Sequence, residues 1–313
     1  MDMYQKREQR KKNKAEEKNN TENNNNMNIN WYPGHMVKAQ NEIKESIKLI
    51  DIVVEVLDAR IPVSSSNPII EEMSKNKGRI IVLNKADLAD KDNLSKWEEH
   101  FNSKGYICIH SDTSKQQSIK QILNTITELG NKIHSEKNKN RTIEIKAITR
   151  VLIVGIPNVG KSTIINKLAN KQVVVTGNKP GVTKRKQWIR LGNNVELLDT
   201  PGLLWPKLDD NNTGLKLALT GNIKQEILDV EVLAYEGLKI LLSNEKYKNI
   251  LKNSYKLSDE NMELDAYELL NEIGRKRGCI VSGGNIDVER ASKLFIEDLK
   301  NGKIGNFSFD EVK

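Results

Sequence analysis

Short apolar runs alternate with amphipathic stretches over the first two thirds of the chain. The runs that are short enough for buried strands are Ile52–Leu57, Ile80–Leu83, Tyr106–His110 and Val151–Val154. Apolar residues at three- and four-residue spacing predict helices at Met36–Ile50, Leu94–Phe101, Ile119–Ile133 and Thr163–Leu168. Strands that alternate with helices predict an α/β fold with a mostly parallel sheet.

Polar segments separate these elements. His134–Arg141 is expected to cross the surface before the strand at Val151, and Lys171–Lys186 to form a long loop with Gly and Pro. Trp188–Leu191 and Val195–Leu198 flank Gly192-Asn193-Asn194, which predicts a β-hairpin.

The last third of the chain has a purely helical pattern. It predicts helices at Leu228–Leu242, Met262–Arg275 and Val288–Lys300, the last with Asp287 as N-cap and Gly302 just past its end. At the other end, residues 1–27 mix Lys/Arg with Glu, become rich in Asn and cannot bury a core. We therefore expect a disordered polar arm at 1–27, an α/β domain at 28–210 and a smaller α-helical domain at 211–313.

The composition narrows the class of protein. A length of 313 residues suits about two domains, and no apolar run approaches the ~18–20 residues of a membrane span. The basic, polar start lacks the apolar segment of a secretory signal. Cys108 and Cys279 stand far apart without a Cys or His at ligand spacing. This excludes a disulfide framework and a cysteine zinc site, and it suits a reducing compartment.

The stretch Gly155–Thr163 has the P-loop spacing G-x-x-x-x-G-K-[ST] between a predicted strand and a predicted helix. Backbone N–H groups of such a loop wrap a phosphate, and the helix N-terminus adds partial positive charge. Lys161 is expected on the outer phosphates and the Ser162 hydroxyl on Mg²⁺. A tight Gly-rich connection without a ligand is the alternative. The residues expected to bind nucleotide here are Asn158, Val159, Gly160, Lys161, Ser162 and Thr163.

Residues Asn84-Lys85-Ala86-Asp87 follow an apolar strand and fit N-K-x-D, the base-reading element of GTPases. An Asp carboxylate accepts from guanine N1–H and the exocyclic amine, and adenine has neither donor in that arrangement. Asn84 can hold either the base or the surrounding loops, and the Lys85 stem can cover the ring. N-K-x-D also occurs by chance on many surfaces. Ser111 and Asp112, after the next strand, match loosely the element that touches guanine O6.

Asp199-Thr200-Pro201-Gly202 fits D-x-x-G, in which Asp199 orients a water on Mg²⁺ and the Gly202 N–H senses the γ-phosphate. Thr183 is the best match for the switch threonine that completes the Mg²⁺ shell. The alternatives are an ordinary turn after a strand and an unrelated loop threonine. The motifs share one location, since each begins at the carboxyl end of a predicted strand, where a parallel sheet binds ligands.

The order N-K-x-D, P-loop, threonine, D-x-x-G resembles a circularly permuted GTPase. Further matches at Trp31–Met36, Asp58-Ala59-Arg60 and Gly274–Gly284 make residues 28–310 similar to the bacterial ribosome biogenesis GTPase A family. The resemblance implies a cytoplasmic, Mg²⁺-dependent GTPase that binds GTP and GDP. It implies binding to the immature large ribosomal subunit, with rRNA and ribosomal proteins as partners, late in assembly, and release after hydrolysis. Neither a membrane nor DNA is an expected partner.

The resemblance also directs the search for catalytic groups. Leu203 follows Gly202 where many GTPases have a glutamine that orients the attacking water, and leucine cannot do this. His35 matches the histidine proposed as catalytic in the family, and an imidazole can orient a water near neutral pH. A histidine packed at a helix start is the alternative. Asn158 matches an Asn that helps to bind K⁺ in related GTPases, so the resemblance implies K⁺ as a second cation.

The basic residues of the tail have two interpretations. On charge alone, Arg275, Lys276, Arg277, Lys300 and Lys303 belong to a solvated face, whereas the resemblance favours contacts to rRNA phosphates. The net charge of +8 fits polyanion partners. It fits equally well a codon usage of the organism that favours Lys, Asn and Ile.

Two rival functions stay open. A GTPase switch with a non-ribosomal protein partner would carry the same motifs. A P-loop kinase for a small molecule would require N-K-x-D and D-x-x-G to be coincidences.

Overall fold

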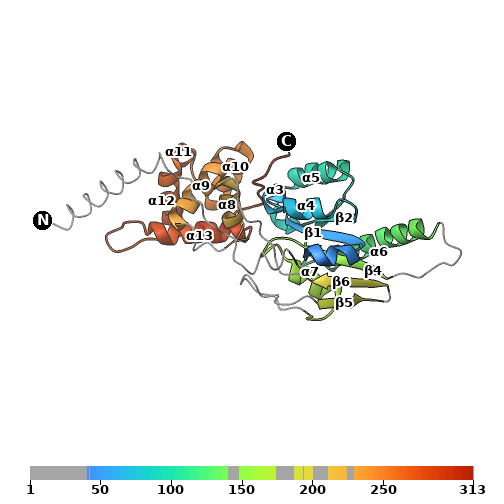
Figure 1. Ribbon diagram of the computed structural model, residues 1–313. Coiled ribbons are helices and arrows are strands. Elements are labelled where there is room, and N and C mark those ends of the chain that lie inside the picture. Colours follow the sequence, from blue (N-terminus) through green and yellow to red (C-terminus); the bar gives the residue numbers. More distant parts are fainter. Residues whose placement is uncertain are drawn as a thin grey trace. The chain divides into compact units, whose positions relative to one another are not determined.

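The computed structural model describes residues 41, 43–139, 148–173, 187–192, 194–199, 211–223 and 229–312, all within the compact unit Tyr32–Lys313. The side chains of Gln187, Asp199 and Asn211 lie outside this description. In these ranges six strands form one sheet in the order β3-β2-β1-β4-β6-β5 (Figure 1). The strands are β1 Ile52–Asp58, β2 Gly78–Asn84, β3 Ile107–Ser111, β4 Thr149–Val154, β5 Gln187–Leu191 and β6 Val195–Asp199. All neighbours are parallel except β5 and β6, so the mostly parallel α/β fold and the hairpin are confirmed.

The strand order reverses between β1 and β4. From β1 the chain moves outward through β2 to β3, then returns to β4 on the other side of β1. Val54 of β1 lies opposite Ile153 of β4 in the parallel register. Ligands of open parallel sheets bind at the carboxyl ends of the strands where the order reverses. The end of β4, where the predicted P-loop starts, is such a place.

Helices cover this sheet, and β1 is buried along its whole length, as expected of a strand covered on both faces. Trp97 and Phe101 pack in one apolar cluster with Leu57 of β1 and Leu83 of β2. The helices are α3 Pro62–Ser65, α4 Pro68–Met73, α5 Lys91–Ser103, α6 Gln116–Asn138 and α7 Lys161–Leu168, with the 3₁₀ turns η1 Ile47–Leu49 and η2 Ala86–Leu88.

The first predicted helix is only partly described. Residues 43–46 are helical and continue into η1, and Ile43 and Ile50 are buried as the pattern predicts. Ile47 is partly exposed.

Two predicted boundaries are wrong. His134–Asn138 was expected in a surface crossing, but it forms the last turns of α6. Lys137 reaches Asp51 at 2.8 Å, and polar residues with adequate helix propensity extend a helix beyond its apolar face. The helix predicted from Met262 is split: Met262 ends α11, and Asp265 caps a new helix by accepting from the N–H groups of Tyr267 and Glu268.

The end of the chain is helical as predicted. We call the described residues from 211 onward the helical region: α8 Asn211–Leu219, α9 Val230–Leu242, α10 Glu245–Tyr255, α11 Asp259–Met262, α12 Ala266–Lys276 and α13 Val288–Lys300. α13 has the predicted bounds, and Asp287 caps it by accepting from the Arg290 N–H. The helices α9, α12 and α13 pack against one another. The domain boundary at residue 210 stays a prediction.

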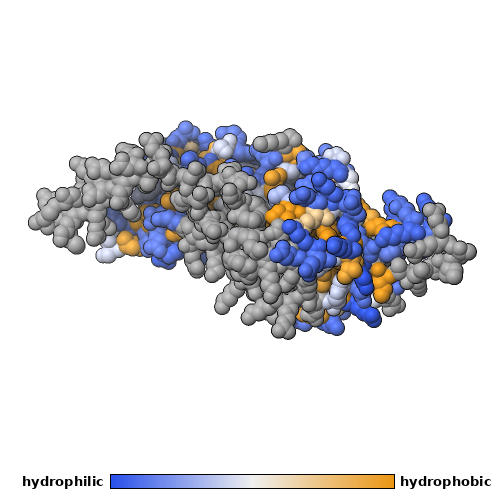
Figure 2. Space-filling view, viewed as in Figure 1, coloured by the Kyte–Doolittle hydropathy of each residue, from blue (hydrophilic) through white to orange (hydrophobic). Residues whose placement is uncertain are grey.

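No helix in the described ranges is long and apolar enough to span a membrane. Exposed large apolar side chains such as Val63, Trp188 and Tyr267 lie on separate elements. On the face shown in Figure 2, apolar residues of the described surface are set among hydrophilic ones.

Candidate nucleotide-binding site

The P-loop follows β4 and needs glycine at two of its turns. Gly155 has φ +151°, and a Cβ there would lie 2.4 Å from the Val56 carbonyl oxygen of β1. Gly160 has φ +101°, and a Cβ there would lie 2.3 Å from Nδ2 of Asn84. Real Cβ atoms do not come this close to other atoms, so a side chain at either position would displace a neighbouring strand or loop.

The loop is arranged to receive an anion. Gly160 is the N-cap of α7, so Lys161, Ser162 and Thr163 form the first turn, where backbone N–H groups lack intrahelical acceptors. Lys161 is only 7% exposed, and its ammonium donates to the Ile156 carbonyl oxygen at 2.8 Å. The cation is therefore held inside the loop, and the residues fit a phosphate group.

Asn84 ties the predicted guanine loop, residues 84–88, to the P-loop. It ends β2, is 1% exposed and donates from Nδ2 to the Val159 carbonyl oxygen at 2.6 Å. Its amide oxygen is buried without a hydrogen-bond partner among the described residues. Of the two roles open to Asn84, the structure thus provides the contact with the surrounding loops.

The rest of the guanine loop leaves one carboxylate free. Lys85 adopts the left-handed conformation with φ 58°, and its ammonium donates to Asp58 Oδ2 at 2.8 Å. Asp87 lies in η2 with an exposed side chain. No other described residue binds the Asp87 carboxylate, so this group is available for the two donors of a guanine edge.

The loop after β3 lies beside the guanine loop, because Ser111 pairs with Asn84 in the parallel register. The Ser111 hydroxyl is buried without a partner in the described ranges. The Asp112 carboxylate accepts from Ser114 N at 2.9 Å, and the Asp112 N–H donates to the Ser118 hydroxyl. The hydrogen bond from the Ser114 hydroxyl, opposed by partial burial, lowers the pKa of Asp112. Both polar groups of Asp112 thus stabilise its own turn.

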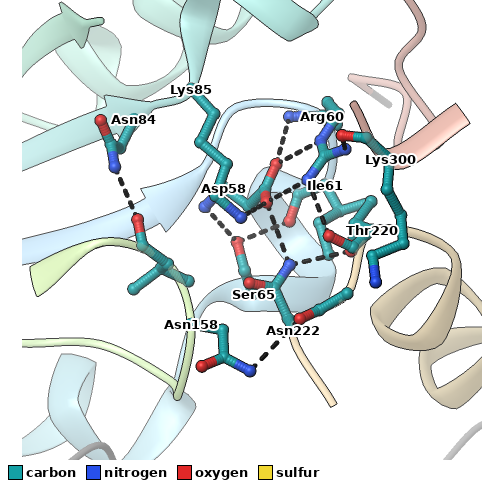
Figure 3. A network of polar contacts seen from close by, with 12 residues as sticks. Asp58, Arg60, Ile61, Ser65, Asn84, Lys85, Asn158, Thr220, Asn222 and Lys300 are labelled. Atoms are coloured by element: carbon teal, nitrogen blue, oxygen red, sulfur yellow. Dashed lines mark hydrogen bonds and ion pairs between the residues drawn. The ribbon is translucent and has the colours of Figure 1, made fainter. Parts of the chain in front are cut away.

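Asp58, which the sequence comparison singled out only as part of a signature, is the centre of a buried network (Figure 3). Its carboxylate is fully buried and accepts from the Arg60 guanidinium at 2.9 and 2.8 Å, from Lys85, and from Asn222 Nδ2 at 3.0 Å. Burial alone would raise the pKa of Asp58, but the charges of Arg60 and Lys85 outweigh it and hold the pKa well below the usual range. Asp58 therefore remains a carboxylate.

His35, Thr183 and Gly202 lie outside the described residues. Asp199 ends β6 opposite Ile153 of β4, but its side chain is not described.

Of the predicted Mg²⁺ ligands, Ser162 alone has a side chain within the described part of the chain, in the first turn of α7. The described ranges contain no cluster of three His, Cys, Asp or Glu side chains that could hold a metal. Mg²⁺ in nucleotide sites needs only one or two protein ligands besides the phosphates, so Ser162 at the P-loop fits it.

The predicted rRNA-binding residues end α12. Arg275 pairs with Glu272, and Arg277 pairs with the buried Asp298 at 3.1 Å. Lys276 is exposed and has no ion pair among the described residues. Lys300 lies near Lys85 and Arg60, and burial together with these cations lowers its pKa.

The P-loop and the guanine loop on a sheet with this strand order define a circularly permuted P-loop GTPase. A family model described as "50S ribosome-binding GTPase" matches residues 150–270. Ribosome biogenesis GTPase A of Bacillus licheniformis is 47% identical over 285 residues, which cover 91% of this chain and 99% of that protein. The chain belongs to the ribosome biogenesis GTPase A family, and it binds and hydrolyses GTP.

Other similar proteins support the same family assignment. Ribosome biogenesis GTPase A of Thermotoga maritima is 34% identical, over 90% of this chain and 94% of that protein. The crystal structure of GNP-bound YlqF from T. maritima has a TM-score of 0.59 at 32% identity and covers 88% of this chain and 98% of its own. The GDP-bound structure of TM YlqF has a TM-score of 0.61 at 32% identity and covers 86% of this chain and 98% of its own.

Proposed function

We propose that this GTPase acts in late maturation of the large ribosomal subunit. The observation that carries the proposal is the match of residues 150–270 to a model of 50S ribosome-binding GTPases, since that stretch joins the P-loop to the helical region. Relatives named ribosome biogenesis GTPase A match over nearly their full length. In this proposal the GTP-bound form joins the immature particle, and hydrolysis releases it.

The proposed nucleotide contacts follow from the described loops. Asp87 reads the guanine edge, Lys85 and Ala86 line the base, and the loop of Ser111 and Asp112 lies on its O6 side. The P-loop residues 158–163 hold the phosphates, with Lys161 on the outer ones. Because Asn84 is already bonded to Val159, we assign it to joining the two loops.

The proposed cations surround the phosphates. Ser162, Thr183 and Asp199 would hold Mg²⁺, which neutralises charge on the β- and γ-phosphate oxygens. Asn158 would help to hold a K⁺ ion. Its Nδ2 donates to the Gly221 carbonyl oxygen at 3.3 Å, and its side-chain oxygen is the group for a cation. GTP turnover that is equal in Na⁺ and K⁺ buffers would remove K⁺ from the proposal.

For hydrolysis we propose that Gly202 senses the γ-phosphate and that His35 orients the attacking water, since Leu203 cannot. His35→Ala should lower GTP turnover on the particle and leave GTP affinity unchanged. His100→Ala is the matched control, because His100 lies on α5 and contacts Trp97 and Phe101 rather than the nucleotide loops. Unimpaired turnover of His35→Ala on the particle would remove His35 from the mechanism.

The helical region is the proposed rRNA-binding part. Arg275 and Arg277 already pair with carboxylates. Of these three residues, Lys276 is therefore the one whose charge is not paired with a described carboxylate and can bind a phosphate. Lys276→Glu should weaken binding to the particle and reduce its salt dependence by about one phosphate contact. Lys239→Glu, on the exposed face of α9 beside Glu236, serves as control.

Co-sedimentation with large-subunit precursors tests the proposal. The full chain with a non-hydrolysable GTP analogue should sediment with precursor particles, less so with GDP, and increasing salt should release it. The particle should also raise the slow GTP turnover of the free protein. Equal turnover with and without particles, or sedimentation independent of nucleotide, would contradict the proposal. Capture of a defined non-ribosomal protein instead would favour the alternative switch.

A further inference from the structure

The helical region contacts both loops that bind the nucleotide. The turn Thr220–Asn222 follows α8. Asn222 Nδ2 donates to the Asp58 carboxylate, and Arg60 Nη2 donates to the Thr220 carbonyl oxygen at 2.8 Å. The next carbonyl of the turn, of Gly221, accepts from Asn158 of the P-loop. Neither the P-loop motif nor N-K-x-D requires these contacts.

Asp58 links this turn to the guanine loop. Its Oδ2 atom accepts from Lys85 Nζ at 2.8 Å and from Asn222 Nδ2 at 3.0 Å (Figure 3). Arg60 holds the same carboxylate and also donates to the Lys300 carbonyl oxygen at the end of α13. Separation of the helical region would remove Asn222 from the Asp58 carboxylate and the Thr220 and Lys300 carbonyl oxygens from Arg60. Asn222 and Arg60 are buried, so water does not compete for these hydrogen bonds while the region is docked. The position of Lys85 and the docking of the helical region are therefore coupled.

The segment after α13 holds the guanine loop from a second direction. Asn306 Nδ2 donates to the Asp87 carbonyl oxygen at 2.9 Å, and the Phe307 N–H donates to the Leu88 carbonyl oxygen at 3.2 Å. A Cβ on Gly302 would lie 2.7 Å from the Leu88 side chain, so the two segments are in tight contact.

This C-terminal segment is itself fixed at its far end. The buried Asp310 carboxylate accepts from the Ser64 N–H and hydroxyl at 2.7 and 2.8 Å and pairs with Lys216 of α8 at 2.9 Å. The Tyr247 hydroxyl of α10 donates to the Ser308 carbonyl oxygen. The helical region and its C-terminal segment therefore hold the guanine loop on two sides.

We propose that the helical region is a positioning element for guanine nucleotides: through Asn222 and Asn306 it holds the guanine loop in its binding conformation. The loop needs such support, because Lys85 has a left-handed backbone that non-glycine residues seldom adopt. The Asn222 and Asn306 contacts lie on the base side of the site, which GTP and GDP share. Docking of the helical region therefore raises the affinity for both nucleotides by the same factor.

Linkage extends this coupling to partners. Whatever binds the helical region and separates it from the guanine loop lowers the affinity for either nucleotide, and a bound nucleotide opposes that separation to the same degree. This route differs from a γ-phosphate switch, which distinguishes GTP from GDP. It holds whether or not the partner is a ribosomal particle.

Nucleotide titrations of the full chain test the proposal. The Kd and the dissociation rate of fluorescent GDP and of a fluorescent non-hydrolysable GTP analogue are measured for wild type, Asn222→Ala and Asn306→Ala. Asn222→Ala should weaken both nucleotides by about tenfold, mostly through faster dissociation, and leave their ratio unchanged. Asn306→Ala should act in the same direction by a few-fold. The KM for GTP should rise while kcat at saturation stays constant.

Asn261→Ala is the matched control, because Asn261 belongs to the capping box of α11 inside the helical region and its side chain accepts from the Ser258 N–H. It should leave both affinities unchanged. Three results would overturn the proposal: unchanged affinities in the two test variants, a loss for the GTP analogue alone, or an equal loss in Asn261→Ala. If Asn222→Ala does not fold by circular dichroism, Asn306→Ala, whose side chain is partly exposed, decides the question. These titrations contain no ribosomal particle, so failure of the ribosomal proposal leaves them unaffected.

Discussion

Replacing Asp58 with asparagine measures what the buried network contributes to stability. Asparagine keeps the shape but removes the charge that faces Arg60, which is 3% exposed, and Lys85. Removal of one partner of a buried ion pair costs about 3–5 kcal/mol. Arg60 keeps two carbonyl acceptors, from Thr220 and Lys300, which favours the lower end, about 3 kcal/mol. For a chain of this length each kcal/mol lowers Tm by about 2 °C, so we expect a fall of about 6 °C at pH 7 in thermal unfolding.

The pH dependence gives a second readout of the same variant. The pKa of Asp58 is lower in the folded protein than its ordinary value of 3.8. The stability it contributes is therefore complete above the unfolded pKa and is lost as the pH falls through the folded pKa. The Tm difference between wild type and Asp58→Asn should have its full value at pH 7 and should decrease as the pH falls below about 4.

Asp92→Asn is the control for this prediction, because Asp92 is an exposed carboxylate that pairs with Lys246, and Tm should not change. A variant as stable as wild type at pH 7, or a gap that stays constant in acid, would refute the reasoning.

The guanine loop, the P-loop and a buried thiol lead to three further predictions. Asp87→Asn should lower GTP affinity by more than about tenfold and favour xanthine nucleotide, measured by competition titration; unchanged GTP affinity would rule out base reading by Asp87. Gly155→Ala should abolish nucleotide binding, because its Cβ meets Val56 at 2.4 Å, whereas Gly192→Ala, with no atom within 4 Å of its Cβ, should bind normally in the same titration. Burial, with a smaller effect of the Glu98 charge, raises the pKa of Cys108 to about 12. A thiol reagent at pH 8 should therefore label Cys108 only after unfolding. Fast labelling of the folded protein would contradict this.

The predicted fold and motif positions agree well with the described structure, because they depend on local patterns. Apolar runs identified strands β1 to β4, and each motif that follows a strand lies at its carboxyl end. The errors lie where local patterns are weak. α6 continues through polar residues, and the short helices α3, α4 and α11 have no long apolar period. The helices α8 and α10 were not predicted either, and α10 buries only Tyr247, Leu251 and Tyr255 among many polar residues. The roles of His35, Thr183 and Gly202 stay predictions.

The role of Asp58 shows why part of the site could not be predicted. In the sequence, Asp58 and Arg60 are a short pair after a strand, and the only signal was their resemblance to a family signature. Arg60 binds Thr220 and Lys300, which follow it by 160 and 240 residues. No periodicity encodes contacts over such separations.

By itself, the sequence determined the permuted order of the motifs, the parallel sheet, and the residue types that bind a guanine nucleotide. Backbone and side-chain periodicity is local, so these features follow from neighbouring residues. Only the tertiary structure decided that Asn84 holds the P-loop and that Asp58 joins the guanine loop to the helical region. These outcomes depend on which polar groups are buried together, since each buried group must find a partner wherever the fold provides one.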